Sequence, residues 1–137
     1  MLADNSGNIG SQASTFIIRS LALGEIGPKD LLRVLRKEVL TSLCMASILL
    51  PVAFIIAFAI TYFSYGGNIL AATHVGLVVS AALLVSMVLT DVIGSLLPLL
   101  LAKLHVDPAG VSAPVITTIG DIVTATTYFT TAIYLLS

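Results

Sequence analysis

Charged residues are scarce in this sequence, where Asp, Glu, Lys and Arg make up 9% of the 137 residues. Soluble domains carry about 25%. The mean hydropathy is +1.10, and the apolar runs are long. This scarcity excludes a sizeable soluble domain and predicts an all-α, polytopic membrane protein in the lipid bilayer. Because one crossing takes about 20 residues, the length allows a bundle of about four transmembrane segments.

Cysteine and the usual catalytic motifs are also missing. Cys44 is the single cysteine, which excludes a disulfide framework. The sequence has no HExxH, no CxxC and no Walker loop. No nucleophile and base can be paired, so we do not expect an enzyme. The net charge of −1 gives no sign of a nucleic-acid partner, and we expect none.

Apolar runs and breakers predict the order of the segments. Residues 1–23 form a helix that is too short and too polar to cross lipid alone. The stretch from Gly24 to Pro28, which contains the strong breaker pair Gly27-Pro28, ends that helix, and Pro51 is expected to kink a later one. Turns follow at Gly66–Asn68 and at Asp107–Pro108, where a turn or helix start is the simplest interpretation. The remaining segments are a basic amphipathic stretch at 29–38 and membrane spans at 39–65, 72–104 and 111–136.

Positive charge predicts the orientation. Four of the six cationic residues lie between residues 29 and 37, and loops of this kind face the cytoplasm. We therefore expect a multi-pass protein of the cell membrane with the turn at Gly66 outside. Both ends of the chain then lie away from the cytoplasm, which leads us to expect an upstream part of the protein before Met1.

Asp121 is the only carboxylate in the last predicted span. An ionisable side chain at the centre of a membrane helix costs roughly 2.5–3.5 kcal/mol and usually has a function. Thr117 and Thr118 lie four and three residues before it and share its helical face. This pattern is typical of the wall of a cation path. The alternative is a carboxylate that only fixes helix packing.

Other polar residues are candidates for the same path. Asn8 and Gln12 lie on one polar face of the first helix, near glycines that favour close helix approach, although they could serve only as hydrogen-bonding contacts between helices. Asp91 lies inside the second predicted span, and packing and pathway roles are equally open for it. Glu38, at the foot of the first span, is either a local ion-pair partner or an acid at the cytoplasmic mouth.

The donor atoms available near Asp121 are all oxygens. Neither Cys nor His lies beside Asp121, which argues against a soft metal. Mg²⁺ dehydrates reluctantly and is usually held through retained waters by one or two carboxylates. One acid among hydroxyl groups suits such an ion, although a proton path would also use a single Asp.

Two motifs resemble the transmembrane domain of the MgtE family of magnesium transporters. The first, GN-x-G-x-Q followed by small residues and an Arg, is matched from Gly7 to Ala22. The second, VDPA-x-x-S-x-P-x-x-T-x-x-D, is matched from Val106 to Asp121. The Arg36–Glu38 stretch resembles the start of the third family helix. Together the motifs cover nearly all of residues 1–137 in the family order.

The resemblance implies a homodimer with a pore between its subunits, lined by the second and fifth family helices. It assigns Asp121 to Mg²⁺ binding in that pore and places Asn8 and Gln12 along it. The family domain has five helices, so the resemblance implies that this chain begins partway through the second. The sequence departs from the family at Asp91, where an amide is usual, and at Ala113, which is polar in some members.

We therefore expect magnesium transport, with hydrated Mg²⁺ passing as through a channel and Asp121 as its ligand. Other divalent cations are candidate substrates. The pore-lining candidates are Asn8, Gln12, Thr117, Thr118 and Asp91. A proton- or sodium-coupled transporter of another solute remains an alternative, as does a membrane assembly subunit that transports nothing.

Overall fold

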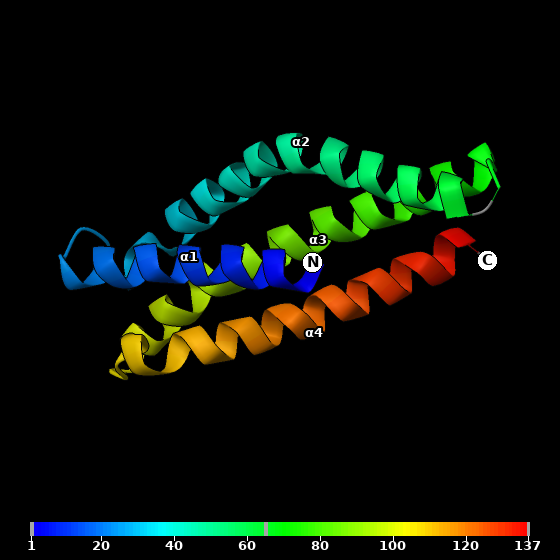
Figure 1. Ribbon diagram of the computed structural model, residues 1–137. Coiled ribbons are helices and arrows are strands. Elements are labelled where there is room, and N and C mark those ends of the chain that lie inside the picture. The colour runs from blue at the N-terminus through cyan, green and yellow to red at the C-terminus, as the bar shows by residue number, and fades with distance from the viewer. Residues whose placement is uncertain (1, 65, 137) are drawn as a thin grey trace.

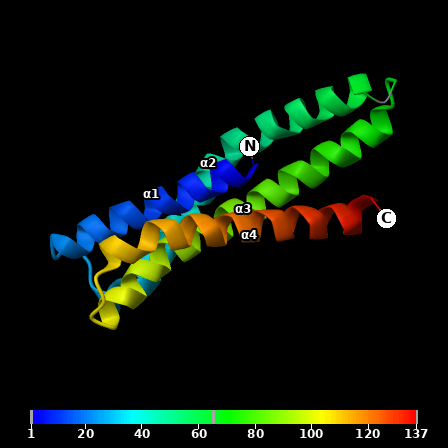
Figure 2. The ribbon, with the colours of Figure 1, turned by 60° about the horizontal axis from the view of Figure 1, so that its bottom comes forward.

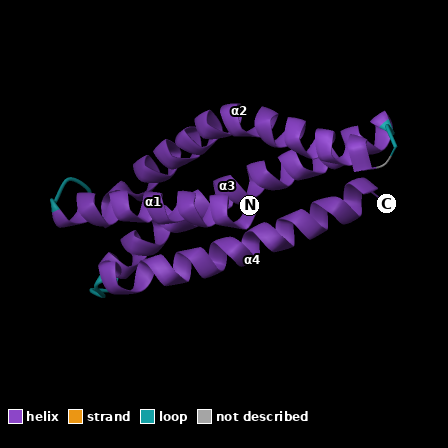
Figure 3. Cartoon of the chain, in the orientation of Figure 1, coloured by secondary structure: helices purple, strands orange, loops and turns teal. Residues whose placement is uncertain are grey.

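The structure, a computed structural model, describes residues 2–64 and 66–136, without the side chains of 2–7, 28, 111–113 and 134–136. Ala113 therefore lies outside the described side chains. Four long helices make up nearly all of the described chain, and none of it is strand (Figure 3), which confirms the all-α prediction. The helices are α1 (Leu2–Ala22), the short 3₁₀ helix η1 (Pro28–Asp30), α2 (Leu31–Ser64), α3 (Ile69–Lys103) and α4 (Pro108–Leu136).

Helix α3 is the centre of the bundle. It packs against α1, α2 and α4, and α1 also packs against α4. Helices α2 and α3 form a long hairpin, and the N-terminal end of α1 lies beside the middle of α3 (Figures 1 and 2). The far half of the hairpin therefore runs alongside α4 without α1.

Helix α2 joins two segments that the sequence treats separately. The basic stretch at 29–38 and the apolar span at 39–65 form one helix from Leu31, because neither Gly nor Pro occurs between Leu31 and Pro51. Pro51 lies inside α2, which bends near its middle (Figure 1). A bend is expected where proline removes one backbone hydrogen bond.

The predicted turns are confirmed. Gly66 and Gly67 have φ values of 61° and 84°, in the left-handed region that glycine adopts most easily. The Asn68 side chain then accepts a hydrogen bond from Ala71 N at 3.0 Å and caps α3. Asp107 does the same for α4, since its Oδ1 accepts from Ala109 N at 3.0 Å. Asp107–Pro108 is therefore a helix start.

Helices α1 and α3 cross in close contact at two glycines. A Cβ on Gly94 would lie 2.3 Å from the carbonyl oxygen of Gly10, and a Cβ on Gly10 would lie 2.6 Å from Thr90 Cγ2. Small residues let membrane helices approach in this way. Two buried apolar clusters flank the crossing. They are Ile9, Ala46, Leu83 and Met87 on one side and Ile17, Val34 and Leu99 on the other.

Two of the expected membrane crossings are supported by the helices themselves. Within the described residues, α2 and α3 are long and apolar enough to span a bilayer. The full number of crossings and the dimeric pore stay predictions.

Candidate functional site

Exposed polar side chains lie along α1 and α4. Asn8 and Gln12 are exposed on α1, and Thr117, Thr118 and Asp121 are exposed on α4. Each set shares a helical face, because its members are three or four residues apart. We call these five residues the polar stripe. In a membrane protein such a stripe needs water or protein against it.

The two helices that carry the polar stripe are in contact through their buried faces. A Cβ on Gly10, between Asn8 and Gln12, would lie 3.0 Å from Ile116 Cγ2, and Ile116 precedes Thr117. Ile116 is fully buried. The contact therefore brings the α1 and α4 parts of the stripe to one level of the bundle.

Asp121 is surrounded on its own helix by hydroxyl groups. The Thr117 and Thr118 hydroxyls donate to the Pro114 carbonyl oxygen at 3.0 and 2.9 Å. Since each hydroxyl oxygen also has acceptor lone pairs, these groups can face a cation or its waters. Within the described residues, no group of three or more His, Cys, Asp or Glu side chains could hold a metal ion. One copy of the chain thus offers one carboxylate at this point.

The outer face of α2 has a different character. Its large exposed side chains are apolar, with Ile48 70% exposed and Ile55 and Ile60 each 63% exposed. Apolar side chains of this size suit contact with lipid tails. The bundle therefore has a lipid-like surface on α2 and a mixed, partly polar surface on α1 and α4.

Asp91 does not lie on the polar stripe. Its side chain is 3% exposed and accepts a hydrogen bond from the Ser42 hydroxyl of α2. It lines a cavity of about 230 Å³ between α1, α2 and α3. Of the stripe, Gln12 alone lines this cavity too, so the sequence candidates divide into an exposed group and a buried acid.

Glu38 joins Asp91 in the wall of the same cavity. Its side chain is 6% exposed. Sequence reasoning considered both acids but did not pair them, and it missed Ser42. One signal was available: Glu38 and Ser42 are four residues apart and share a helical face. Their pairing with α3 follows only from the tertiary packing.

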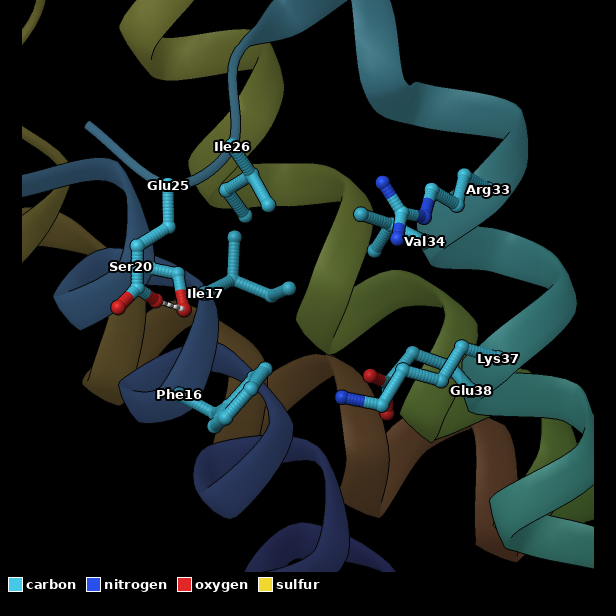
Figure 4. A pocket seen from close by; sticks show the side chains of 9 residues that line it. All are labelled: Phe16, Ile17, Ser20, Glu25, Ile26, Arg33, Val34, Lys37 and Glu38. Atoms are coloured by element: carbon cyan, nitrogen blue, oxygen red, sulfur yellow. Dashed lines mark hydrogen bonds between the residues drawn. The ribbon is translucent and has the colours of Figure 1, made fainter. Parts of the chain in front are cut away.

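A second cavity, of about 180 Å³, adjoins the first through shared wall residues (Figure 4). Phe16, Lys37 and Glu38 line both. The Lys37 ammonium lies 4.2 Å from the centre of the Phe16 ring, a cation–π contact. Near the C-terminal end of α1, the Ser20 hydroxyl donates a hydrogen bond to a Glu25 carboxylate oxygen at 3.2 Å. The second cavity therefore leads from the α1–α2 loop toward Glu38.

Positive charge gathers at this end of the bundle. The six Lys and Arg residues belong to the last turns of α1, to η1, to the first two turns of α2 and to the last turn of α3. These segments meet at one end (Figure 1). They are Arg19, Lys29, Arg33, Arg36, Lys37 and Lys103.

Comparison with known proteins agrees with the family motifs. The family model described as MgtE, a divalent cation transporter, matches residues 1–131. The magnesium transporter MgtE of Bacillus subtilis is 33% identical over 94% of this chain and 27% of its own length. That of Thermus thermophilus is 34% identical over 99% of this chain and 28% of its own. The magnesium transporter MgtE of Enterococcus faecalis is 28% identical over 96% of this chain and 27% of its own length.

The chain thus spans between a quarter and a third of the length of these curated relatives. The match includes the polar stripe, the buried acids and the crossing of α1 and α3. With a family match over residues 1–131, the chain belongs to the MgtE family of divalent cation transporters.

Proposed function

We propose that this chain conducts Mg²⁺ across the cell membrane as the transmembrane part of a transporter. Two copies pair along the polar stripe, and hydrated Mg²⁺ passes between them. Asp121 of each copy binds the ion in transit. Asn8, Gln12, Thr117 and Thr118 line the path on either side.

The exposure of Asp121 on α4, a helix that we expect to cross the membrane, carries the proposal. A carboxylate that faces lipid inside a membrane span costs several kcal/mol, so a single copy with α4 across the bilayer is poorly suited to it. A second copy placed over the stripe removes the carboxylate from lipid and encloses a polar passage. The apolar outer face of α2 suits the lipid side of the same assembly.

The chemistry of the stripe suits a hydrated hard cation. Two copies supply two Asp121 carboxylates, and the threonine hydroxyls and amides can bond to water. Mg²⁺ is usually held by one or two carboxylates through retained waters, so a cluster of three acids on one chain is not required. Mn²⁺ and other divalent ions share this preference for oxygen.

The charge distribution supports an inward direction of flow. The end that holds the six Lys and Arg residues faces the cytoplasm under the positive-inside rule. A cation entering from the opposite end moves toward the negative interior, and each elementary charge gains about 2.3 kcal/mol per 100 mV. Flow down this gradient needs no coupling ion.

An uptake assay tests the proposal. The purified chain is placed in liposomes that contain a Mg²⁺-sensitive dye, and uptake is driven by a potential that is negative inside. We expect Mg²⁺ uptake by the wild type and loss of uptake in Asp121→Ala. Thr126→Ala, an exposed change on another face of α4, serves as the control and should transport normally.

Each other outcome identifies a rival. Normal Mg²⁺ uptake in Asp121→Ala contradicts the role of the carboxylate. Solute uptake that follows a proton or sodium gradient and ignores Mg²⁺ indicates a coupled transporter. A wild type that inserts and melts cooperatively but transports no ion indicates an assembly subunit.

A further inference from the structure

The cavity between α1, α2 and α3 contains two buried acids that the polar stripe does not use. Asp91 is 3% exposed and Glu38 is 6% exposed, and both line the cavity. Buried carboxylates that face one space repel each other unless a cation or proton lies between them. The cavity therefore calls for positive charge.

The protein's own side chains supply little positive charge to these two carboxylates. Asp91 accepts one hydrogen bond, from Ser42, although a carboxylate has about four acceptor positions. Among the described side chains, neither a hydrogen bond nor an ion pair reaches the carboxylate of Glu38. Glu38 is thus almost fully buried and lines this cavity, and the same side chain belongs to the wall of the adjoining cavity (Figure 4).

Lys37 is the nearest cation, and its position leaves the space open. It lines the same cavity, but its ammonium lies over the Phe16 ring at 4.2 Å. With two carboxylates and one ammonium, the groups around the cavity carry a formal net negative charge. A cation can therefore enter beside Glu38 without displacing Lys37 from Phe16.

We propose that this cavity is a second divalent-cation site, inside one copy of the chain and separate from Asp121. Asp91 and Glu38 provide the charge, Gln12 and Thr41 provide neutral oxygens, and Ser42 orients Asp91. All four donor side chains line the cavity. They are hard oxygen donors, which bind Mg²⁺ and Mn²⁺ in preference to soft metals.

The size of the cavity suits an ion that keeps part of its water. Its volume is about 230 Å³, and one water molecule takes about 30 Å³ in the liquid. Several waters can thus remain on the ion, as Mg²⁺ requires. The adjoining cavity, which shares Glu38, gives a route from the basic end of the bundle.

Binding of Mn²⁺, followed by electron paramagnetic resonance in lipid nanodiscs, tests this site apart from transport. The background variant is Asp121→Asn, which removes the stripe carboxylate. We expect the Asp121→Asn variant to bind one Mn²⁺ per chain in the cavity, and we expect added Mg²⁺ to displace this ion. Adding Asp91→Asn or Glu38→Gln should weaken binding at least about ten-fold, since even the loss of partners around metal ligands costs 10–100-fold.

Two further variants keep the result interpretable. Asp107→Asn, a change at an exposed acid that retains its helix cap, should leave Mn²⁺ affinity unchanged. Lys37→Met should tighten binding by removing a like charge from the cavity, and it does not touch either carboxylate. If the acid variants fail to fold, the Mn²⁺ affinity of Lys37→Met tests the cavity site instead.

The proposal is overturned if the Asp121→Asn chain binds no Mn²⁺, which would leave a shared proton as the cation. It is also overturned if Lys37→Met binds no more tightly or if folded acid variants bind Mn²⁺ as the background does. None of these results bears on Asp121, whose role is decided by the uptake assay.

Discussion

Gly94 of α3 lies directly against the backbone of Gly10 of α1, so closely that a Cβ at position 94 would fall 2.3 Å from the Gly10 carbonyl oxygen. This crossing fixes where α1 lies on the bundle. Asn8 and Gln12 lie two residues to either side of Gly10, on the exposed face of α1, so their position on the bundle depends on the absence of a side chain at Gly94.

Replacing Gly94 by Ala should therefore destabilise the bundle. Because the nearest atoms belong to backbone, the helices must separate, and overpacking of this kind costs about 1–3 kcal/mol. A thermal melt in detergent measures the change. Gly110→Ala, where a Cβ meets nothing within 4 Å, is the control, and equal melting of the two variants would refute the close crossing.

Ser42→Ala tests the link between α2 and α3. The change removes the hydrogen bond that Ser42 donates to Asp91, and a buried polar group left without its partner costs about 1–3 kcal/mol. A lower melting temperature is expected. Ser47→Ala removes a hydroxyl that is exposed and bonded to its own helix, so it should have little effect. A stability loss no larger than that of Ser47→Ala would argue against a buried Asp91.

Asn68→Ala tests the start of α3. The Asn68 side chain accepts from Ala71 N, and loss of such a cap usually costs about 1 kcal/mol. Amide hydrogen exchange should become faster in the first turn of α3 and stay unchanged around Gly94. Asn68→Ser, which can still cap the helix, should retain the protection, and its failure to do so would assign the effect to something other than the cap.

Local signals in the sequence predict much of this fold. Gly24, Gly66 and Asp107 mark the helix ends, the two glycines through positive φ values and Asp107 through capping, and these effects need no distant partner. The change of polarity at residue 38 predicts a boundary between the basic stretch and the following span, but the structure has one continuous helix there. A change from polar to apolar residues does not interrupt the backbone hydrogen bonds of a helix, and neither Gly nor Pro occurs between Leu31 and Pro51.

The candidate site is only partly predictable, because helical spacing relates residues on one helix but not residues on different helices. Helical spacing groups Asp121 with Thr117 and Thr118, since all three lie on one helix. The Ser42–Asp91 hydrogen bond joins residues 49 positions apart, and periodicity carries no information about such a pair. The shared cavity of Glu38 and Asp91 likewise depends on how α2 packs on α3.

The central claim is that two copies meet along the face that carries Asp121. Cross-linking with a short bis-maleimide in native membranes tests it most directly, with Thr118→Cys in a Cys44→Ser background. We expect Thr118→Cys to form a covalent dimer with reduced Mg²⁺ uptake, whereas Ile48→Cys, on the apolar face of α2, should stay monomeric. A covalent dimer through Ile48→Cys, with Thr118→Cys remaining monomeric and still transporting Mg²⁺, would contradict the account.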